Sequence, residues 1–264
     1  MAATHLKPDS FATWQEYYWT YQNLLAEKYY IPLFESWGVT MQHKKILDVG
    51  CGDGGFTAGL AQSGAQCTGV EVRDFGWSSK HPNLRFIEQD ILADDAQQMI
   101  GSDYDIIVLR DVIEHIPRQT KYAFMKALQK FTGPHGIILL TFPPFFSPFG
   151  LHQQTFLKSF LRQVPYLGWI PGVLLDGILK LTGESSKARA DVADIRDCQM
   201  SLGQFQKMVD RLSYNIEQEK YYTIRPSHEL RYGWKMRESR VAKLPLLREI
   251  LVLGCVFQLS LPQE

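Results

Sequence analysis

Residues 45–55 of the chain are Lys-Ile-Leu-Asp-Val-Gly-Cys-Gly-Asp-Gly-Gly. A short apolar run, Ile46–Val49 with one acidic residue, leads into a glycine-rich turn, and a helical pattern starts at Phe56. Glycine adopts positive φ angles easily and lets the backbone come close to a ligand, while the first turn of a helix presents unpaired N–H groups. The stretch therefore predicts a strand, a ligand-binding turn and a helix, in that order.

The sequence around this turn alternates between strand and helix patterns. Short runs rich in Val, Ile and Leu are typical of strands buried on both faces, and they occur at Lys45–Val49, Cys67–Val72, Leu84–Glu88, Tyr104–Leu109 and Gly136–Phe142. Helical patterns separate them at Phe56–Ser63, Ala93–Ile100 and Arg118–Phe131. This alternation predicts an α/β protein with a doubly wound parallel sheet.

The segments before and after this core have a different residue composition and spacing. Residues 11–37 are rich in aromatic side chains at helical spacing, with a break at Pro32, so we predict an N-terminal helical cap over residues 1–40. The segment 143–150, Pro-Pro-Phe-Phe-Ser-Pro-Phe-Gly, cannot continue a central strand because proline donates no hydrogen bond. We expect a lid-like apolar insertion over about 143–200 within a domain of residues 41–264. The domain is then completed by a helix and two strands near Ser201–Leu212, Asn215–Ile224 and Leu251–Leu261.

The glycine-rich turn fits two kinds of cofactor. Residues 50–55 match the Gly-x-Gly-x-x-Gly dinucleotide fingerprint, and Glu71, 21 residues after the first glycine, ends the second strand where an acid can bind ribose hydroxyls. However, Asp48 precedes the turn, Asp90 follows the third strand, and another acidic segment (110–116) follows the fourth. A ligand surrounded by carboxylates is expected to be cationic. The sulfonium and ammonium groups of S-adenosylmethionine suit such a site better than a pyrophosphate does.

Residues 45–142 resemble a class I S-adenosylmethionine-dependent methyltransferase of the small-molecule type. The resemblance depends on LDVGCGDG at 47–54, Glu71, QDI at 89–91 and DVIEHI at 111–116, in the order and spacing of that family. It implies a Rossmann-like sheet of seven strands with an antiparallel last strand. The Asn-Pro-Pro-aromatic signature of amino and nucleobase methyltransferases is absent after the fourth strand, which disfavours N-methylation.

The same resemblance implies a cofactor site at the carboxyl ends of the first four strands. The glycine turn would line the methionine part, Glu71 would bind the ribose, Asp90 with Ile91 would frame the adenine, and Asp111 would close over the methionine. The predicted cofactor-binding residues are Asp48, Gly50, Cys51, Gly52, Gly54, Glu71, Val72, Asp90, Ile91, Arg110 and Asp111. We expect no metal in the site, and the four cysteines lack the spacing of metal ligands.

Two histidines are candidate catalytic residues. A hydroxyl acceptor is assisted by a general base near neutral pH, most simply a histidine, in a site that excludes water. His152 follows the carboxyl end of the fifth strand, where open α/β sheets bind their ligands, so we prefer it as the base. For His115 a positioning role is the favoured alternative. Arg225 and Arg231, in a polar stretch after a late strand, either clamp an anionic group of the acceptor or belong to a solvated loop.

The composition restricts the partners. The chain has 264 residues, and 28 Lys and Arg balance 28 Asp and Glu, so no net charge attracts nucleic acid. Cysteine usage, the lack of a secretory leader pattern and the lack of an apolar run of about 18 residues predict a cytoplasmic protein. The apolar insertion has three open interpretations: a lid over the acceptor, a peripheral membrane contact or a dimer face. The oligomeric state stays open.

Together these features predict methyl transfer from S-adenosylmethionine to a small-molecule acceptor, at an oxygen of an amphipathic metabolite. A lipid-linked sugar, an isoprenoid phenol and a polyketide are the acceptor types considered. One alternative is an NAD(P)-dependent reductase that uses the same turn, which would leave Asp48, Asp90 and the segment 111–116 without a role. Another is a non-catalytic adenosylmethionine-binding subunit that buries its insertion against a partner.

Overall fold

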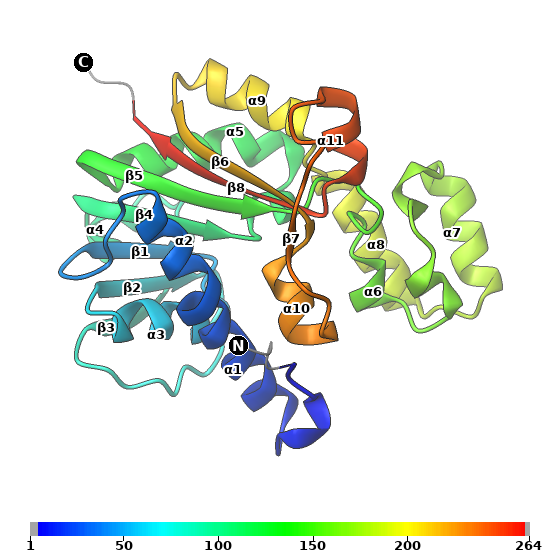
Figure 1. Cartoon of the computed structure of the whole chain (residues 1–264), viewed down its shortest axis with the longest axis horizontal. Helices are drawn as coiled ribbons and strands as arrows, with labels where there is room; N and C mark the ends of the chain where they lie inside the picture. The colour runs from blue at the N-terminus through cyan, green and yellow to red at the C-terminus, as the bar shows by residue number, and fades with distance from the viewer. Residues whose placement is uncertain (1–4, 262–264) are drawn as a thin grey trace.

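The computed structural model describes residues 5–261, in which one eight-stranded sheet carries helices on both faces (Figure 1). The first five strands are parallel and are β1 (Lys45–Val49), β2 (Gln66–Glu71), β3 (Leu84–Glu88), β4 (Tyr104–Arg110) and β5 (Thr132–Phe142). They are followed by β6 (Asn215–Ile224), β7 (Arg237–Glu238) and β8 (Gly254–Ser260). The strand order is β3-β2-β1-β4-β5-β8-β6-β7, so the chain winds outward from β1 in both directions, as the α/β pattern predicts.

The predicted count of seven strands is one too low. The additional strand, β7, has two residues and pairs with β6 at the edge of the sheet, and a pair of residues carries no alternation that the sequence could reveal. β8 is antiparallel to both β5 and β6, which agrees with the expected antiparallel last strand. β2 ends at Glu71 rather than Val72, and the Val72 side chain is exposed.

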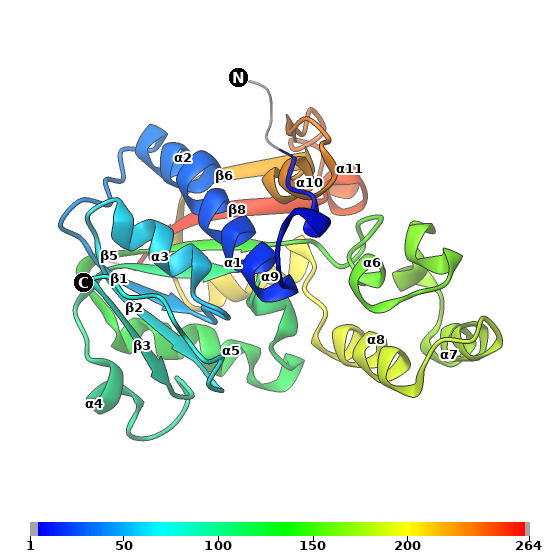
Figure 2. The ribbon, with the colours of Figure 1, turned by 90° about the horizontal axis from the view of Figure 1, so that it is seen from below.

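Helices form a layer on each face of the sheet (Figure 2). One layer contains α1 (Trp14–Leu25), α2 (Ile31–Ser36) and α3 (Gly55–Gln62). The other contains α4 (Ala96–Ile100), α5 (Arg118–Ala127) and α9 (Leu202–Arg211). Because side chains alternate along a strand, Ile46 of β1 packs into the first layer and Leu47 into the second. Two apolar cores therefore hold the carboxyl end of β1 in place.

The N-terminal helices pack directly against α3. A Cβ on Gly59 of α3 would lie 2.7 Å from the Cβ of Ala26, so the glycine permits this close approach. Between α1 and α2 the chain forms a π-helical turn, Ala26–Tyr30, just before Pro32. Proline has no N–H and its ring crowds the carbonyl four residues earlier, and a wider turn relieves both problems. Pro32 thus changes the type of helix where the sequence indicated a break.

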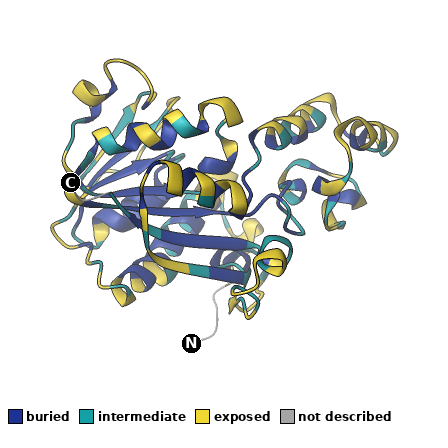
Figure 3. Cartoon of the chain, turned by 90° about the horizontal axis from the view of Figure 1, so that it is seen from above, coloured by how far each residue is buried: buried dark blue, intermediate teal, exposed yellow. Residues whose placement is uncertain are grey.

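The segment after β5 forms a separate helical unit beyond the carboxyl end of that strand (Figure 1). It contains α6 (Gln153–Phe156), α7 (Gly172–Leu181) and α8 (Ser186–Cys198) around a small core of its own that includes Leu175, Leu179 and Val192. In Figure 3, the helices of this unit carry many exposed residues, coloured yellow. The remaining α-helices of residues 5–261 are α10 (Pro226–Tyr232) and α11 (Pro245–Leu251). Across residues 5–261, every helix is too short or too polar to cross a bilayer.

Candidate functional site

The turn between β1 and α3 is built from glycines with positive φ angles. The angle is +75° at Gly50, +55° at Gly52 and +79° at Gly54. A Cβ on Gly50 would lie 2.5 Å from Cγ2 of Val112, and one on Gly54 would collide with the ring of Phe86. The turn therefore excludes larger residues at two positions. Gly50 and Gly52, with Cys51 between them, line a cavity at the carboxyl ends of the strands.

Cys51 and Asp48 are both buried at this turn. Burial raises the pKa of the Cys51 thiol, so the group stays neutral. The Asp48 carboxylate accepts a 2.6 Å hydrogen bond from the hydroxyl of Thr57 on α3, and burial raises its pKa to about 6. Asp48 thus ties β1 to α3 beneath the turn, and a role toward the cofactor stays a prediction.

Glu71 lies at the carboxyl end of β2, beside the glycine turn. Its Oε2 accepts a hydrogen bond from the backbone N–H of Gly52 (3.2 Å), and its Oε1 accepts one from the N–H of Val72 (2.9 Å). The two bonds orient the carboxylate next to the turn, where the resemblance expects a ribose. Val72 itself is exposed and contributes its backbone to this arrangement.

The residues expected around the adenine follow β3. Asp90 is exposed, and its Oδ1 accepts a hydrogen bond from the backbone N–H of Leu92, while Ile91 is buried. An aromatic pair that sequence reasoning missed lies nearby. The Trp77 ring stacks on Phe86 with centroids 5.2 Å apart, and its indole N–H donates to the carbonyl of Gly52 at 2.8 Å. Trp77 thereby fastens the loop after β2 to the glycine turn.

Asp111, at the end of β4, is the centre of a buried charge network. Its carboxylate accepts hydrogen bonds from Arg225 and from the hydroxyl of Thr141, and the guanidinium of Arg110 lies 3.5 Å away. Burial disfavours the ionised carboxylate, but the two arginines overcome it and hold the pKa of Asp111 at about 2. The φ angle of Asp111 is 54°, a left-handed conformation that this network maintains.

This network corrects the predicted roles of Arg225. The stretch after β6 is neither a solvated loop nor a free pair of clamping arginines, because it forms helix α10 over the cavity and Arg225 is committed to Asp111. Arg231 remains available at the cavity wall, where its guanidinium lies 5.8 Å from the ring centroid of Tyr21. The pairing of Arg225 with Asp111 joins positions 114 residues apart, which no local pattern signals.

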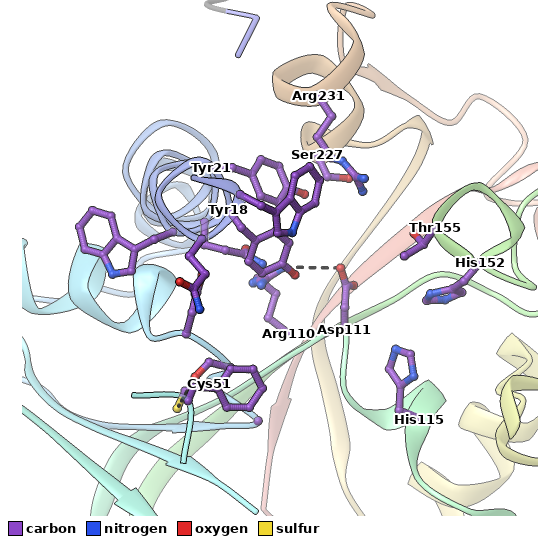
Figure 4. Close-up of a pocket in the computed structure, with 18 of the residues that line it drawn as sticks. Tyr18, Tyr21, Cys51, Arg110, Asp111, His115, His152, Thr155, Ser227 and Arg231 are labelled. Carbon is purple, nitrogen blue, oxygen red and sulfur yellow. Dashed lines mark hydrogen bonds and ion pairs between the residues drawn. The ribbon is translucent and has the colours of Figure 1, made fainter. Parts of the chain in front are cut away.

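The two candidate catalytic histidines come together in the cavity (Figure 4). The ring centroids of His115, after β4, and His152, from the insertion, are 5.1 Å apart. His152 has a left-handed backbone (φ 57°), and burial, reinforced by the positive fields of His115 and Arg225, lowers its pKa to about 3. Burial lowers the pKa of His115 as well. Both imidazoles are therefore neutral near pH 7 and able to accept a hydrogen bond.

The carboxylate of Glu114 lies next to this pair. Its side chain is 4% exposed, and its Oε1 is 3.9 Å from Nε2 of His115. Burial, followed by the negative charge of Asp111, raises the pKa of Glu114 well above its usual range. Lys121 is close but donates to the carbonyls of Ile113 and Cys198 instead. Sequence reasoning assigned Glu114 no role, although it precedes His115 in the motif.

Aromatic and basic side chains from three parts of the chain complete the cavity, which has a volume of about 1210 Å³. Helix α1 contributes Tyr18 and Tyr21, α10 contributes Arg231, and the insertion contributes His152 and Thr155 (Figure 4). The predicted cofactor residues that line the cavity are Gly50, Cys51, Gly52, Arg110 and Asp111. Glu71 and Asp90 lie outside this lining, and Asp111 is already paired with arginines. The fit to a cofactor therefore depends on the glycine turn, where Gly50 has no room for a Cβ and a ligand can approach the backbone closely.

A family model described as a methyltransferase domain matches residues 18–168, and the chain belongs to this family. It is a class I S-adenosylmethionine-dependent methyltransferase, which confirms the resemblance seen in the sequence. The match spans β1–β5 and enters the insertion, so it includes the glycine turn and both histidines. Family membership decides against a nicotinamide-dependent reductase.

Two curated relatives carry the same name. The chain is 30% identical over 135 residues to the ubiquinone biosynthesis O-methyltransferase of Idiomarina loihiensis, covering 48% of this chain and 51% of that protein. This match thus spans about half the length of the relative. The chain is 25% identical over 195 residues to the ubiquinone biosynthesis O-methyltransferase of Acinetobacter baumannii, covering 72% of this chain and 75% of the other.

Solved structures share the fold at low identity. The magnesium protoporphyrin IX methyltransferase of Synechocystis PCC 6803 with bound S-adenosylhomocysteine (SAH) has a TM-score of 0.52 at 15% identity, covering 92% of this chain and 84% of that chain. An S-adenosylmethionine-dependent methyltransferase from Archaeoglobus fulgidus has a TM-score of 0.51 at 10% identity, covering 96% of each chain. These similarities confirm the Rossmann-like architecture.

Proposed function

We propose that the protein methylates a hydroxyl oxygen of an amphipathic small molecule. The observation that carries the proposal is that the glycine turn and the His115–His152 pair open into one cavity. Bound S-adenosylmethionine supplies the methyl group, which the acceptor oxygen takes as the carbon–sulfur bond breaks and its electron pair stays on sulfur. The curated relatives are named as O-methyltransferases of ubiquinone biosynthesis, which supports oxygen as the methylated atom.

The chain's own residues divide between the two substrates. Glu71 would hold the ribose hydroxyls, Asp90 and Ile91 the adenine, and Gly50 and Gly52 the methionine part. The neutral imidazoles of His115 and His152 accept a hydrogen bond from the acceptor hydroxyl. The role of His152 as general base stays a prediction, and its pKa of about 3 disfavours proton transfer to it near pH 7. Helix α1 borders the cavity on one side, and α10 and the insertion border it on the other.

The wall of the cavity indicates the kind of acceptor. Tyr18, Tyr21 and Phe156 present aromatic rings, whereas Arg231 and Thr155 present polar groups. A flat, partly apolar molecule with a hydroxyl group fits this mixture, since rings pack against rings and polar groups bind the oxygens. We therefore favour the isoprenoid phenol among the acceptor types that the sequence suggested.

We also propose that the insertion contacts a lipid surface. On α7 the side chains of Val173, Leu174 and Leu181 are 88%, 61% and 90% exposed, and Trp169 just before the helix is half exposed. Exposed Lys180 lies in the last turn of α7, and exposed Lys187 lies at the start of α8. An apolar helix face with basic neighbours is typical of helices that lie in the interface of an anionic membrane. An amphipathic acceptor would partition into the same surface.

The reaction is tested with methyl-labelled S-adenosylmethionine and short-chain alkylated catechols and phenols as acceptors. We expect labelled methyl ethers, identified by mass spectrometry, and their loss in a His152→Asn variant that still binds SAH. Asparagine tolerates the left-handed backbone at this position. Cofactor binding without a product from any acceptor would favour the non-catalytic subunit, and labelled amines alone would contradict O-methylation.

A further inference from the structure

Glu114, His115 and His152 form a cluster whose nearest ligand-type atoms, a carboxylate oxygen and two ring nitrogens, all lie within 4.8 Å of one another. Glu114 and His115 belong to a single turn after β4, Ile113–His115, whereas His152 comes from the insertion at the start of α6. Folding thus brings three potential metal ligands together from two distant segments.

The polar atoms of this cluster are buried without partners. Among residues 5–261, both carboxylate oxygens of Glu114 and the Nε2 atom of His152 are buried and accept no hydrogen bond. An unpaired buried polar atom is unfavourable, and more so when it is charged, so three of them within one cluster favour a compensating partner. Lys121 does not provide one, because its ammonium group donates to two backbone carbonyls.

Charges of both signs surround the cluster: Arg225 and Lys121 act on Glu114, and Asp111 opposes them. Asp111 lies three residues before Glu114, but Arg110 and Arg225 already neutralise its charge, so it is not counted as a ligand. The His115 side chain is 44% exposed and lines the cavity with His152, so its ring is free to turn toward an ion. Metal–ligand bonds of about 2.1 Å in a tetrahedral site place the ligand atoms about 3.4 Å apart, so the widest separation here would have to close by up to about 1.4 Å.

We propose that Glu114, His115 and His152 bind one divalent transition-metal ion at the acceptor end of the cavity. Two imidazoles and one carboxylate favour ions such as Zn²⁺, Mn²⁺ or Fe²⁺ over Mg²⁺ and Ca²⁺, which prefer oxygen ligands. Three protein ligands leave at least one coordination position open toward the cavity. This revises the expectation from the sequence that the site holds no metal.

The proposal rests on the proposed O-methylation and changes the role of the histidines in it. The acceptor hydroxyl replaces a water molecule on the ion, and the ion lowers the pKa of the hydroxyl so that its proton passes to solvent. The remaining alkoxide or phenolate oxygen attacks the methyl carbon. The histidines then act as metal ligands rather than as proton acceptors.

The test is a titration of purified, tag-free protein with Co²⁺, followed by visible absorption, with Zn²⁺ as competitor. We expect d–d bands that saturate at about one ion per chain and disappear when Zn²⁺ is added. Glu114→Gln and His152→Asn should weaken Co²⁺ binding at least about 10–100-fold. The matched controls Glu88→Gln and His135→Asn, at exposed positions, should leave it unchanged.

SAH binding is measured by calorimetry on the same samples. Intact SAH binding without Co²⁺ bands, or bands that persist in both cluster variants, would overturn the metal site and leave the methyltransferase function standing. Saturable Co²⁺ binding that both variants weaken, in protein that makes no methyl ether, would establish the site and contradict the proposed reaction. Folding of each variant is verified by its thermal unfolding midpoint.

Discussion

Individual residues of the cofactor half could be predicted because their constraints are local. Gly50 and Gly52 need positive φ angles in a turn that directly follows a strand, and Glu71 ends the next strand. The partner of Asp111 could not be predicted, because Arg225 is brought to it by the docking of α10 onto the sheet. Nor could Glu114 be recognised, since its isolation from hydrogen-bond partners exists only in the fold.

The first prediction concerns Gly50. In Gly50→Ala the new methyl group would lie 2.5 Å from Val112 at a φ angle of +75°, so the turn must shift. We expect SAH affinity to fall at least about tenfold, a change worth about 1.4 kcal/mol. Gly38→Ala is the matched control, because its φ angle is +81° with no atom within 4 Å of the added carbon. Calorimetry on both variants distinguishes a local effect at the glycine turn from a general effect of alanine at a positive φ angle. Equal SAH affinities of the two variants would contradict the prediction.

The second prediction concerns the charge of Asp111. Its pKa is about 2 in the folded protein against an ordinary value of 3.8. A lowered carboxyl pKa contributes stability above the ordinary value, and this contribution, about 2 kcal/mol, is lost as the pH falls through the folded value. The free energy of unfolding should therefore decline between about pH 4 and pH 2, and this component should be missing in Asp111→Asn.

The same variant tests the buried network at neutral pH. Asp111→Asn leaves Arg110 and Arg225 without their counter-charge, and we expect a loss of about 3–5 kcal/mol in urea unfolding at pH 7. The control is Asp176→Asn, which breaks the exposed pair with Arg189 and should change little, because solvent screens such pairs. A similar loss in both variants would show that burial does not set the strength of the network.

At the scale of elements, the strands were found more reliably than the helices that surround the cavity. β1 and β4 follow apolar runs that are buried on both faces, and the structure has them within one residue of the predicted bounds. β3 has the predicted bounds although it is only partly buried, and β5 begins at Thr132, four residues before its predicted start. Helix α10 has seven residues, begins at Pro226 and contains polar side chains, so its periodicity is weak. The helix is stabilised by its packing over the cavity, and a short stretch of sequence does not reveal such tertiary contacts.

Helix α7 provides the third prediction. In Leu181→Glu and Val173→Glu a charge replaces an exposed apolar side chain on the face proposed to meet lipid. We expect binding to phosphatidylglycerol vesicles, measured by sedimentation, to weaken about tenfold or more, since burial of one such side chain is worth about 1.5–3 kcal/mol. Met99→Glu, on α4 and half exposed, should bind like the unchanged protein. If the unchanged protein does not bind vesicles, the proposed lipid contact is contradicted, and the insertion is then a lid over the acceptor or a dimer face.

For the whole molecule, one cavity unites segments from both ends of the chain. The sheet supplies the cofactor side, and α1, α10 and the insertion supply the acceptor side, as the lining residues show. The sequence predicts the sheet well because most of its strands pack into the apolar cores on the two faces of the sheet. The acceptor side depends on how three surface segments meet. His115, His152 and Arg231 could be proposed from the sequence, but the closeness of the two histidines could not.

The last prediction follows from the fact that segments from both ends of the chain line one cavity. A ligand that binds the folded chain alone stabilises all of it, by about 2.7 kcal/mol at a hundredfold excess over Kd. SAH should therefore raise the thermal unfolding midpoint, and NADH should not.

The role of Glu71 is tested with Glu88 as its matched control, because the two residues pair across β2 and β3 at the ends of these strands. Glu71→Gln should bind SAH about 10–100-fold more weakly, because each hydrogen bond to a charged group contributes about 1.5–3 kcal/mol. Glu88→Gln should match the unchanged protein, and equal effects would remove Glu71 from the ribose site.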